Sequence, residues 1–200
     1  MRSSRDAMLA LASTLLVSAC SGQPASNPVP EKTAAAAPAQ SPVERGKYLV
    51  TAAGCNDCHT PWKMGANGPE PDMTRMLSGH PEKAEVGKPP KLEGAWMAAV
   101  SNDFTAWAGP WGISYTANIT PDQNTGIGIW TEEMFVKAIR TGKHMGTDTS
   151  RDIQPPMPWQ MYRNLTDDDL KAIYAYLRTI PPVTNHIPDP VAGPAPPAKK

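Results

Sequence analysis

Two cysteines separated by two residues, Cys55 and Cys58, are followed at once by His59 in the stretch GCNDCHT. This cluster constrains the fold more than any other feature, because each chemistry that can use it demands different partners elsewhere in the chain. Three chemistries can: a disulfide or redox dithiol, a zinc site, and covalent attachment of haem through both sulfur atoms.

Zinc and thiol exchange are the weaker alternatives. A structural zinc ion takes four ligands, and adjacent Cys58 and His59 reach one tetrahedral ion only with strain. The other histidines, His80, His144 and His186, do not have ligand-like spacing. A redox dithiol opens a helix that follows a strand, whereas this pair follows a predicted helix.

Haem attachment explains all three residues together. In a Cys-x-x-Cys-His sequence the two sulfur atoms bond the two vinyl groups of one porphyrin, and the histidine becomes an axial ligand of the iron. The sequence therefore predicts one haem c, held by Cys55 and Cys58, with His59 on the iron. Haem also supplies the apolar body that a chain with only two phenylalanines lacks.

The best candidate for the opposite axial position is Met157, in the stretch IQPPMPWQMY. Three neighbouring prolines restrict the backbone, so the methionine is predicted to lie on a stiff loop. The alternative is a packing methionine, since the chain has ten. His144 and Met145 are the rival ligands, followed by His80.

The N-terminal residues resemble an export signal. Residues 1–19 have a basic start and an apolar run, and VSAC at residues 17–20 resembles a bacterial lipobox with Cys20 as the lipidated residue. Residues 20–41 are rich in Pro and Ala and are predicted to form a tether. This predicts a periplasmic, membrane-anchored lipoprotein, in the compartment where haem c is attached.

The formal net charge is zero, and no cluster of basic residues indicates a nucleic-acid partner. Residues 42–182 are predicted to form the domain, and the Pro-rich residues 183–200 a disordered tail.

Three helices are predicted from caps and apolar spacing, at residues 42–53, 131–141 and 166–179. The stretch between residues 60 and 115 is rich in Gly and Pro, and we expect a long loop insert there, with a short helix at residues 93–100 and no strands. The fold class is therefore predicted to be mainly α.

Three blocks carry a family resemblance: RGKYLVTAAGCNDCH, ANITPDQNTGIGIWTEEMFVKAIRTG and PPMPWQMYRNLTDDDLKAIYAYLRTIPP. They resemble class I-like bacterial c-type cytochromes and are similar to the haem domains in cytochrome c subunits of membrane-bound alcohol and gluconate dehydrogenases. The resemblance implies a cytochrome c fold, with three to four helices around one covalent haem. It also implies thioether bonds at Cys55 and Cys58 and axial ligands His59 and Met157. Those subunits carry several haem motifs, whereas this chain has one, and its stretch at residues 60–115 is longer.

Supporting roles are also predicted for residues around the haem. Gly46 is expected where the first helix crosses the last, opposite Tyr174 or Leu177. The carbonyl of Pro69 is expected to accept the second ring proton of His59. The candidates for contact with the haem propionates are Trp107, Trp111, Tyr115, Asn118 and Arg140.

These features predict a single-electron carrier without substrate chemistry of its own, whose partners are a dehydrogenase, an oxidase or another cytochrome. A second hypothesis is a haem subunit of a dehydrogenase complex, in which catalysis belongs to a partner. A third is a haem gas sensor or peroxidase, which needs an open face on the iron.

Overall fold

The computed structural model describes residues 40–194, and the predicted signal, Cys20 and nearly all of the tether lie outside them. The first helix, α1, spans Pro42–Ala52. A capping box begins it: the Ser41 hydroxyl accepts a hydrogen bond from the Glu44 amide, and the Glu44 carboxylate accepts one from the Ser41 amide. This prediction is confirmed, with a C-terminal end one residue earlier than expected.

The other two predicted helices are also confirmed. Helix α3 spans Glu132–Thr141, capped by the Thr131 hydroxyl and ended by Gly142 in a left-handed conformation, φ 72°. Helix α5 spans Asp167–Leu177 and is capped by the Thr166 hydroxyl. These cap residues are local in sequence, which explains why the helix limits could be predicted.

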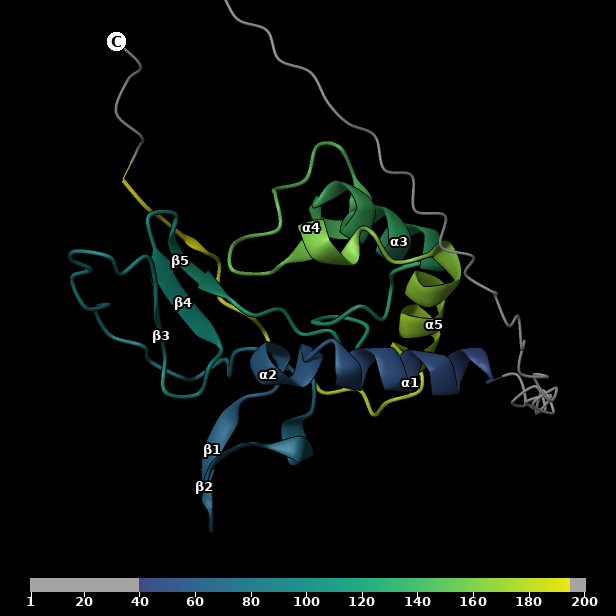
Figure 1. The fold of residues 1–200 in the computed structure, drawn as a ribbon, viewed down its shortest axis with the longest axis horizontal. Coiled ribbons are helices and arrows are strands. Elements are labelled where there is room, and N and C mark those ends of the chain that lie inside the picture. Colours follow the sequence, from purple (N-terminus) through teal and green to yellow (C-terminus); the bar gives the residue numbers. More distant parts are fainter. Residues whose placement is uncertain (1–39, 195–200) are drawn as a thin grey trace, which may run out of the picture. The chain divides into compact units, whose positions relative to one another are not determined.

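Helices α1 and α5 cross, α3 also contacts α5, and α4 (Trp159–Tyr162) contacts α3 (Figure 1). Gly46 lies at the crossing, as predicted, but opposite Ala172 and Tyr176. The hydrophobic core lies around this crossing and continues onto α3 and the loops beside it. Its members are Leu49, Val50, Leu77, Ile127, Phe135, Ile139, Leu170, Ile173, Leu177 and Ile180.

Two short α-helices were not predicted, α2 (Cys55–His59) and α4 (Trp159–Tyr162). Two 3-10 turns, η1 (Met73–Arg75) and η2 (His144–Gly146), complete the helical elements of residues 40–194. Segments of three to five residues are too short to show helical spacing in a sequence.

The stretch predicted as a loop without strands contains most of the β-structure. Strands β1 (Trp62–Gly65) and β2 (Gly68–Pro71) form a hairpin. A four-stranded antiparallel sheet has the order β3 (Ala99–Val100), β4 (Ala106–Gly109), β5 (Gly112–Tyr115) and β6 (Val191–Ala192). Residues 93–100 are therefore not a helix. Residues 40–194 combine five α-helices with two small sheets, so the mainly α prediction is not confirmed for them.

The C-terminal segment is ordered as far as residue 194, which corrects the prediction of a tail disordered from residue 183. Asn185 is only 3% exposed, and β6 pairs with β5. The Asn118 side chain donates to the carbonyl of Val183 over 2.8 Å. Polar contacts of this kind have no periodic pattern, so they leave no trace in the sequence.

Asp122 joins this segment to the loop before α3. Its Oδ1 accepts hydrogen bonds from the amides of Asn124 and Thr125 and from the Thr125 hydroxyl. Its Oδ2 accepts one from the Thr184 hydroxyl over 2.8 Å. The bonds from Thr125 and then Thr184 lower the pKa of Asp122 to about 2.

A lowered carboxylate pKa stabilises the fold at pH values above the ordinary pKa of about 3.8, and the effect disappears as the pH falls through about 2. We therefore expect Asp122→Asn to lower the melting temperature at pH 7. The difference from wild type should shrink between pH 4 and pH 2. Thermal unfolding followed by circular dichroism measures it, and a pH-independent difference would contradict this role of the charge.

Within residues 40–194, none of the helices has the length and apolar character needed to cross a membrane.

Candidate haem-binding site

Helix α2 carries both cysteines and the histidine on a single short element (Figure 1). Gly54 separates it from α1 with a left-handed backbone, φ 67°, which only glycine adopts without strain. Cys55 and Cys58 are free cysteines, so no disulfide joins them.

The surroundings of both thiols favour the protonated form. Burial, followed by the nearby Asp57 charge, raises the pKa of Cys55 to about 11, and the same two causes raise the pKa of Cys58. A redox dithiol needs the opposite, a cysteine with a lowered pKa. No cluster of three metal-binding side chains (His, Cys, Asp or Glu) occurs among residues 40–194.

His59 is oriented by a carbonyl group. Its Nδ1 lies 2.8 Å from the carbonyl oxygen of Ala117, in the segment that follows β5. Burial lowers the pKa of His59, although the bond to Ala117 opposes the shift. In the neutral ring, the Nδ1 proton is therefore donated to Ala117, which leaves the lone pair on Nε2 available to a metal.

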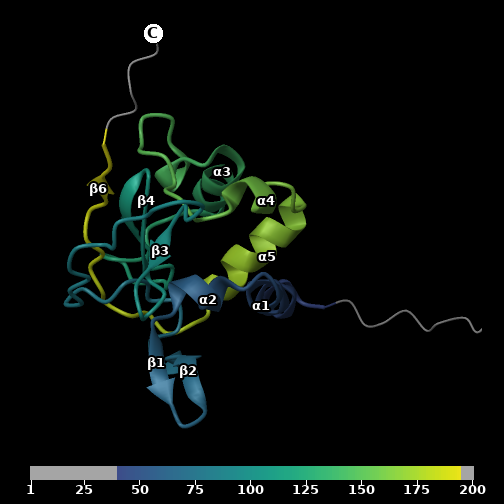
Figure 2. The same ribbon diagram turned by 60° about the vertical axis from the view of Figure 1, so that its left-hand side comes forward.

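The prediction that the Pro69 carbonyl accepts the second ring proton of His59 was wrong. Pro69 lies in strand β2 opposite Met64, and the hairpin projects from the rest of the domain (Figure 2). Pro69 and Ala117 are 10 and 58 residues from His59, and no sequence pattern distinguishes the more distant carbonyl as the acceptor.

The backbone of α2 is fastened by the residues that follow it. The Thr60 hydroxyl donates to Asn56 over 2.8 Å. The indole N–H of Trp62 donates to the carbonyl of Asp57, between the two cysteines, over 3.0 Å. The Trp62 ring packs on Phe104 with ring centroids 4.7 Å apart. The haem-motif turn is therefore held in place independently of the thiols.

Met157 is partly buried and packs against the same hydrophobic core as Cys55. It lies on the loop before α4, and α4 is tied to the end of α1 by Tyr162, whose hydroxyl donates to the Ala53 carbonyl over 2.8 Å. Burial, and then the proximity of Cys55, raises the pKa of Tyr162. The Met157 loop and α2 thus both contact the core.

The rival ligands lie in other surroundings. The His144 ring meets Trp130 edge-on at 5.5 Å, and Met145 follows it in a left-handed conformation. His80 is completely buried on the sheet side, with Nδ1 2.7 Å from the Thr105 hydroxyl. Met145 is not among the described hydrophobic side chains packed against the core, whereas Met157 is.

The propionate contacts stay a prediction. Four of the five side chains already bond protein atoms, and Tyr115 packs against the His80 ring. Trp107 donates to Phe104, Trp111 to Ser114, Asn118 to Val183 and Arg140 to Asp167.

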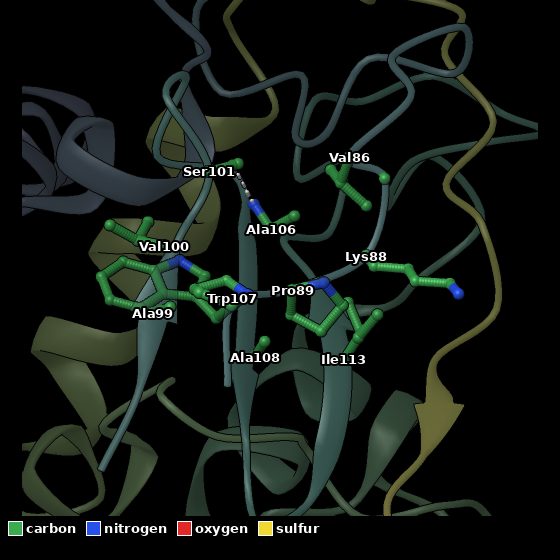
Figure 3. A pocket seen from close by; sticks show the side chains of 12 residues that line it. Val86, Lys88, Pro89, Ala99, Val100, Ser101, Ala106, Trp107, Ala108 and Ile113 are labelled. Atoms are coloured by element: carbon green, nitrogen blue, oxygen red, sulfur yellow. Dashed lines mark hydrogen bonds between the residues drawn. The ribbon is translucent and has the colours of Figure 1, made fainter. Parts of the chain in front are cut away.

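The surroundings of Cys55 and Met157 fit haem. Ten hydrophobic side chains pack against the core yet are only partly buried, so an apolar cofactor has surface to cover. They are Cys55, Met76, Ile119, Trp130, Val136, Met157, Tyr162, Leu165, Tyr174 and Tyr176. A separate small pocket on the sheet, beside Trp107, Pro89 and Ile113, contains none of the predicted ligands (Figure 3).

A histidine whose Nδ1 bonds a carbonyl, two thiols on the same short helix and a core with partly exposed apolar side chains are the features expected of a haem-binding domain. The family model for cytochrome c matches residues 43–181, and the chain belongs to the cytochrome c family. Members of this family carry covalently bound haem c and transfer electrons.

Relatives agree with this assignment. The chain is 34% identical over 137 residues to the fructose dehydrogenase cytochrome subunit of Gluconobacter japonicus, covering 68% of this chain and 21% of that protein. It is 33% identical over 134 residues to the gluconate 2-dehydrogenase cytochrome c subunit of Pantoea cypripedii, covering 67% and 22%. It is 41% identical over 83 residues to the cytochrome c subunit of the quinone alcohol dehydrogenase of Gluconobacter oxydans, covering 40% and 17%. The matched region is thus about a fifth of each relative.

Proposed function

We propose that this chain is a monohaem electron carrier in which Cys55 and Cys58 form the thioether bonds and His59 and Met157 bind the iron. The observation that carries the proposal is the hydrogen bond from His59 Nδ1 to Ala117, 2.8 Å long, beside two unpaired thiols. It leaves Nε2 as the ligand atom. Met157 is supported by its packing against the core that Cys55 also contacts.

Haem supplies an iron that changes between two oxidation states. The protein's part is to hold that iron with one imidazole and one thioether, which raises the reduction potential, and to keep water away with its apolar core. The three prolines around Met157 would restrict the loop and hold the thioether in place in both oxidation states, so that little rearrangement would accompany electron transfer.

The proposed position in the cell rests on residues 1–41. Lipid attachment at Cys20 is supported by the apolar run and the VSAC sequence, and residues 20–41 would tether a domain that begins at residue 42. Membrane fractionation of wild type and Cys20→Ser tests this. We expect wild type with the membranes and the variant in the soluble periplasmic fraction, and membrane retention of the variant would refute it.

The proposed partner is a dehydrogenase, since three relatives are cytochrome subunits of fructose, gluconate and quinone alcohol dehydrogenases. In that setting the chain would accept electrons from the catalytic subunit and pass them to an oxidase or to another cytochrome. Co-purification of a flavoprotein or quinoprotein with the tagged chain would identify the donor.

The decisive experiment is the optical spectrum of protein matured in a host with export and haem-attachment systems. We expect thioether haem that acidified organic solvent does not extract, and a far-red band of iron–sulfur ligation in the oxidised state. Extractable or absent haem would overturn the proposal. Rapid carbon monoxide binding by the reduced protein would favour a gas sensor or peroxidase.

A further inference from the structure

Asn185 lies beyond residues 43–181, the part of the chain that the family model matches, yet it is only 3% exposed. Both ends of its amide are used. Nδ2 donates to the carbonyls of Ser78, over 2.7 Å, and His80, over 2.8 Å. Oδ1 accepts from the Glu82 amide over 3.0 Å and from Arg75 over 3.3 Å. Asn185 therefore holds the segment Leu77–His80 by hydrogen bonds to the two carbonyls that flank Gly79, and we call this pair of bonds the clamp.

The segment Leu77–His80 lies between the haem motif and the residues after β5, whose Ala117 carbonyl orients the His59 ring. On one side, the Gly79 amide donates to the main-chain carbonyl of His59 over 2.8 Å. On the other side, the His80 amide donates to the carbonyl of Thr116 over 3.0 Å. The segment therefore sets the spacing between the His59 backbone and the peptide groups next to Thr116.

Gly79 shows how tight this spacing is. Its backbone is left-handed, with φ 74°, and a Cβ there would lie 2.5 Å from the Thr116 oxygen and 2.6 Å from the Ala117 carbonyl carbon. The Ala117 carbonyl is the one that accepts the ring proton of His59. A displacement of this segment therefore reaches both the backbone of His59 and its hydrogen-bond acceptor.

We propose that Asn185 is a positioning residue for His59: by clamping Leu77–His80, it fixes the length of the bond from His59 Nδ1 to Ala117 and thereby tunes the reduction potential. This inference rests on the proposed function, in which His59 is the axial ligand. A strong bond from Nδ1 makes the imidazole a better donor and favours the oxidised iron. Releasing the clamp weakens the bond and favours the reduced iron.

Asn185→Asp is the sharpest test, because it keeps the shape and the Oδ1 acceptor but removes the Nδ2 donors to Ser78 and His80. The negative charge that it adds would by itself favour oxidised iron and lower the potential, so a rise in the potential is specific to the lost donors. We expect the potential to rise by an amount equal to about a threefold change in the reduction equilibrium, roughly 28 mV at 59 mV per tenfold. In the reduced protein, NMR should show the His59 Nδ1 proton exchanging with solvent about tenfold faster. Asn185→Ser, which retains one donor, is expected between wild type and Asn185→Asp.

Thr184→Val is the matched control. It removes the neighbouring bond to Asp122, and so loosens the same tail without touching Leu77–His80. We expect the reduction potential and the exchange rate of the His59 Nδ1 proton to equal those of wild type. If Asn185→Asp yields no haem-loaded protein, the potential and the exchange rate of Asn185→Ser alone are compared with those of wild type.

A wild-type potential and exchange rate in the readable Asn185 variant would overturn this inference, as would an equal shift in Thr184→Val. If instead the wild-type spectrum lacks thioether haem, the proposed function itself fails. The two failures are therefore distinguishable.

Discussion

Gly46→Leu is expected to yield almost no haem-loaded protein, below about a tenth of the wild-type content. A Cβ at Gly46 would lie 2.8 Å from the Tyr176 Cβ and closer still to the Ala172 carbonyl oxygen. Both neighbours belong to α5, and one is backbone, so no change of rotamer relieves the overlap. The helices must separate, which we expect to cost at least about 3 kcal/mol from a total stability of roughly 5–15 kcal/mol.

The measurement is haem content per protein after export, determined from the pyridine haemochrome spectrum and total protein. Lys47→Leu is the matched control, because it places the same side chain at the next position of α1, which is exposed. We expect the control to mature like wild type. A Gly46→Leu variant with normal haem content would show that α1 and α5 tolerate a wider crossing.

The crossing shows what a sequence can reveal about packing. Gly46 was predicted at the contact because a glycine lets the first helix approach the last closely, and the alternative was a mild helix flaw costing about 1 kcal/mol. Its neighbours were predicted as Tyr174 or Leu177, whereas they are Ala172 and Tyr176. The apolar stripe of α5 predicted the face towards the core, but the small residue Ala172 marks where a second helix approaches.

The elements that were missed share a physical cause. Strands of two to four residues, such as β3 with Ala99 and Val100, give no alternation to detect. The sheet is defined by pairing, and β6 joins it from about 80 residues further along the chain, since Val191 pairs with Ile113. Such pairs depend on the tertiary fold and not on local propensity.

The candidate site likewise contains residues that local spacing predicts and partners that only the tertiary fold determines. Cys55, Cys58 and His59 act from one turn, so their spacing predicted them as a unit. The acceptor for His59 is a backbone carbonyl, at Ala117, and a carbonyl is present at every residue. Only the fold selects one carbonyl among many, and for the same reason the clamp formed by Asn185 could not be predicted from the sequence.

Met157→Ala is expected to remove the far-red band of the oxidised protein and to lower the reduction potential. A thioether stabilises reduced iron more than water does, so its loss favours the oxidised state. We expect a change of about a thousandfold in the reduction equilibrium, roughly 180 mV at 59 mV per tenfold. The thioether bonds at Cys55 and Cys58 are untouched, so the haem should remain attached.

Two further methionine variants make this prediction specific. Met145→Ala removes the rival ligand within η2, and Met161→Ala removes a methionine on α4 that is 72% exposed. Both should keep the band and the potential, because neither side chain is among the described residues that pack against the core. Loss of the band in Met145→Ala, with its retention in Met157→Ala, would transfer the sixth position to the loop after α3. Since that loop lacks the three prolines around Met157, the stiffness that we take to hold the thioether on the iron would then need another origin.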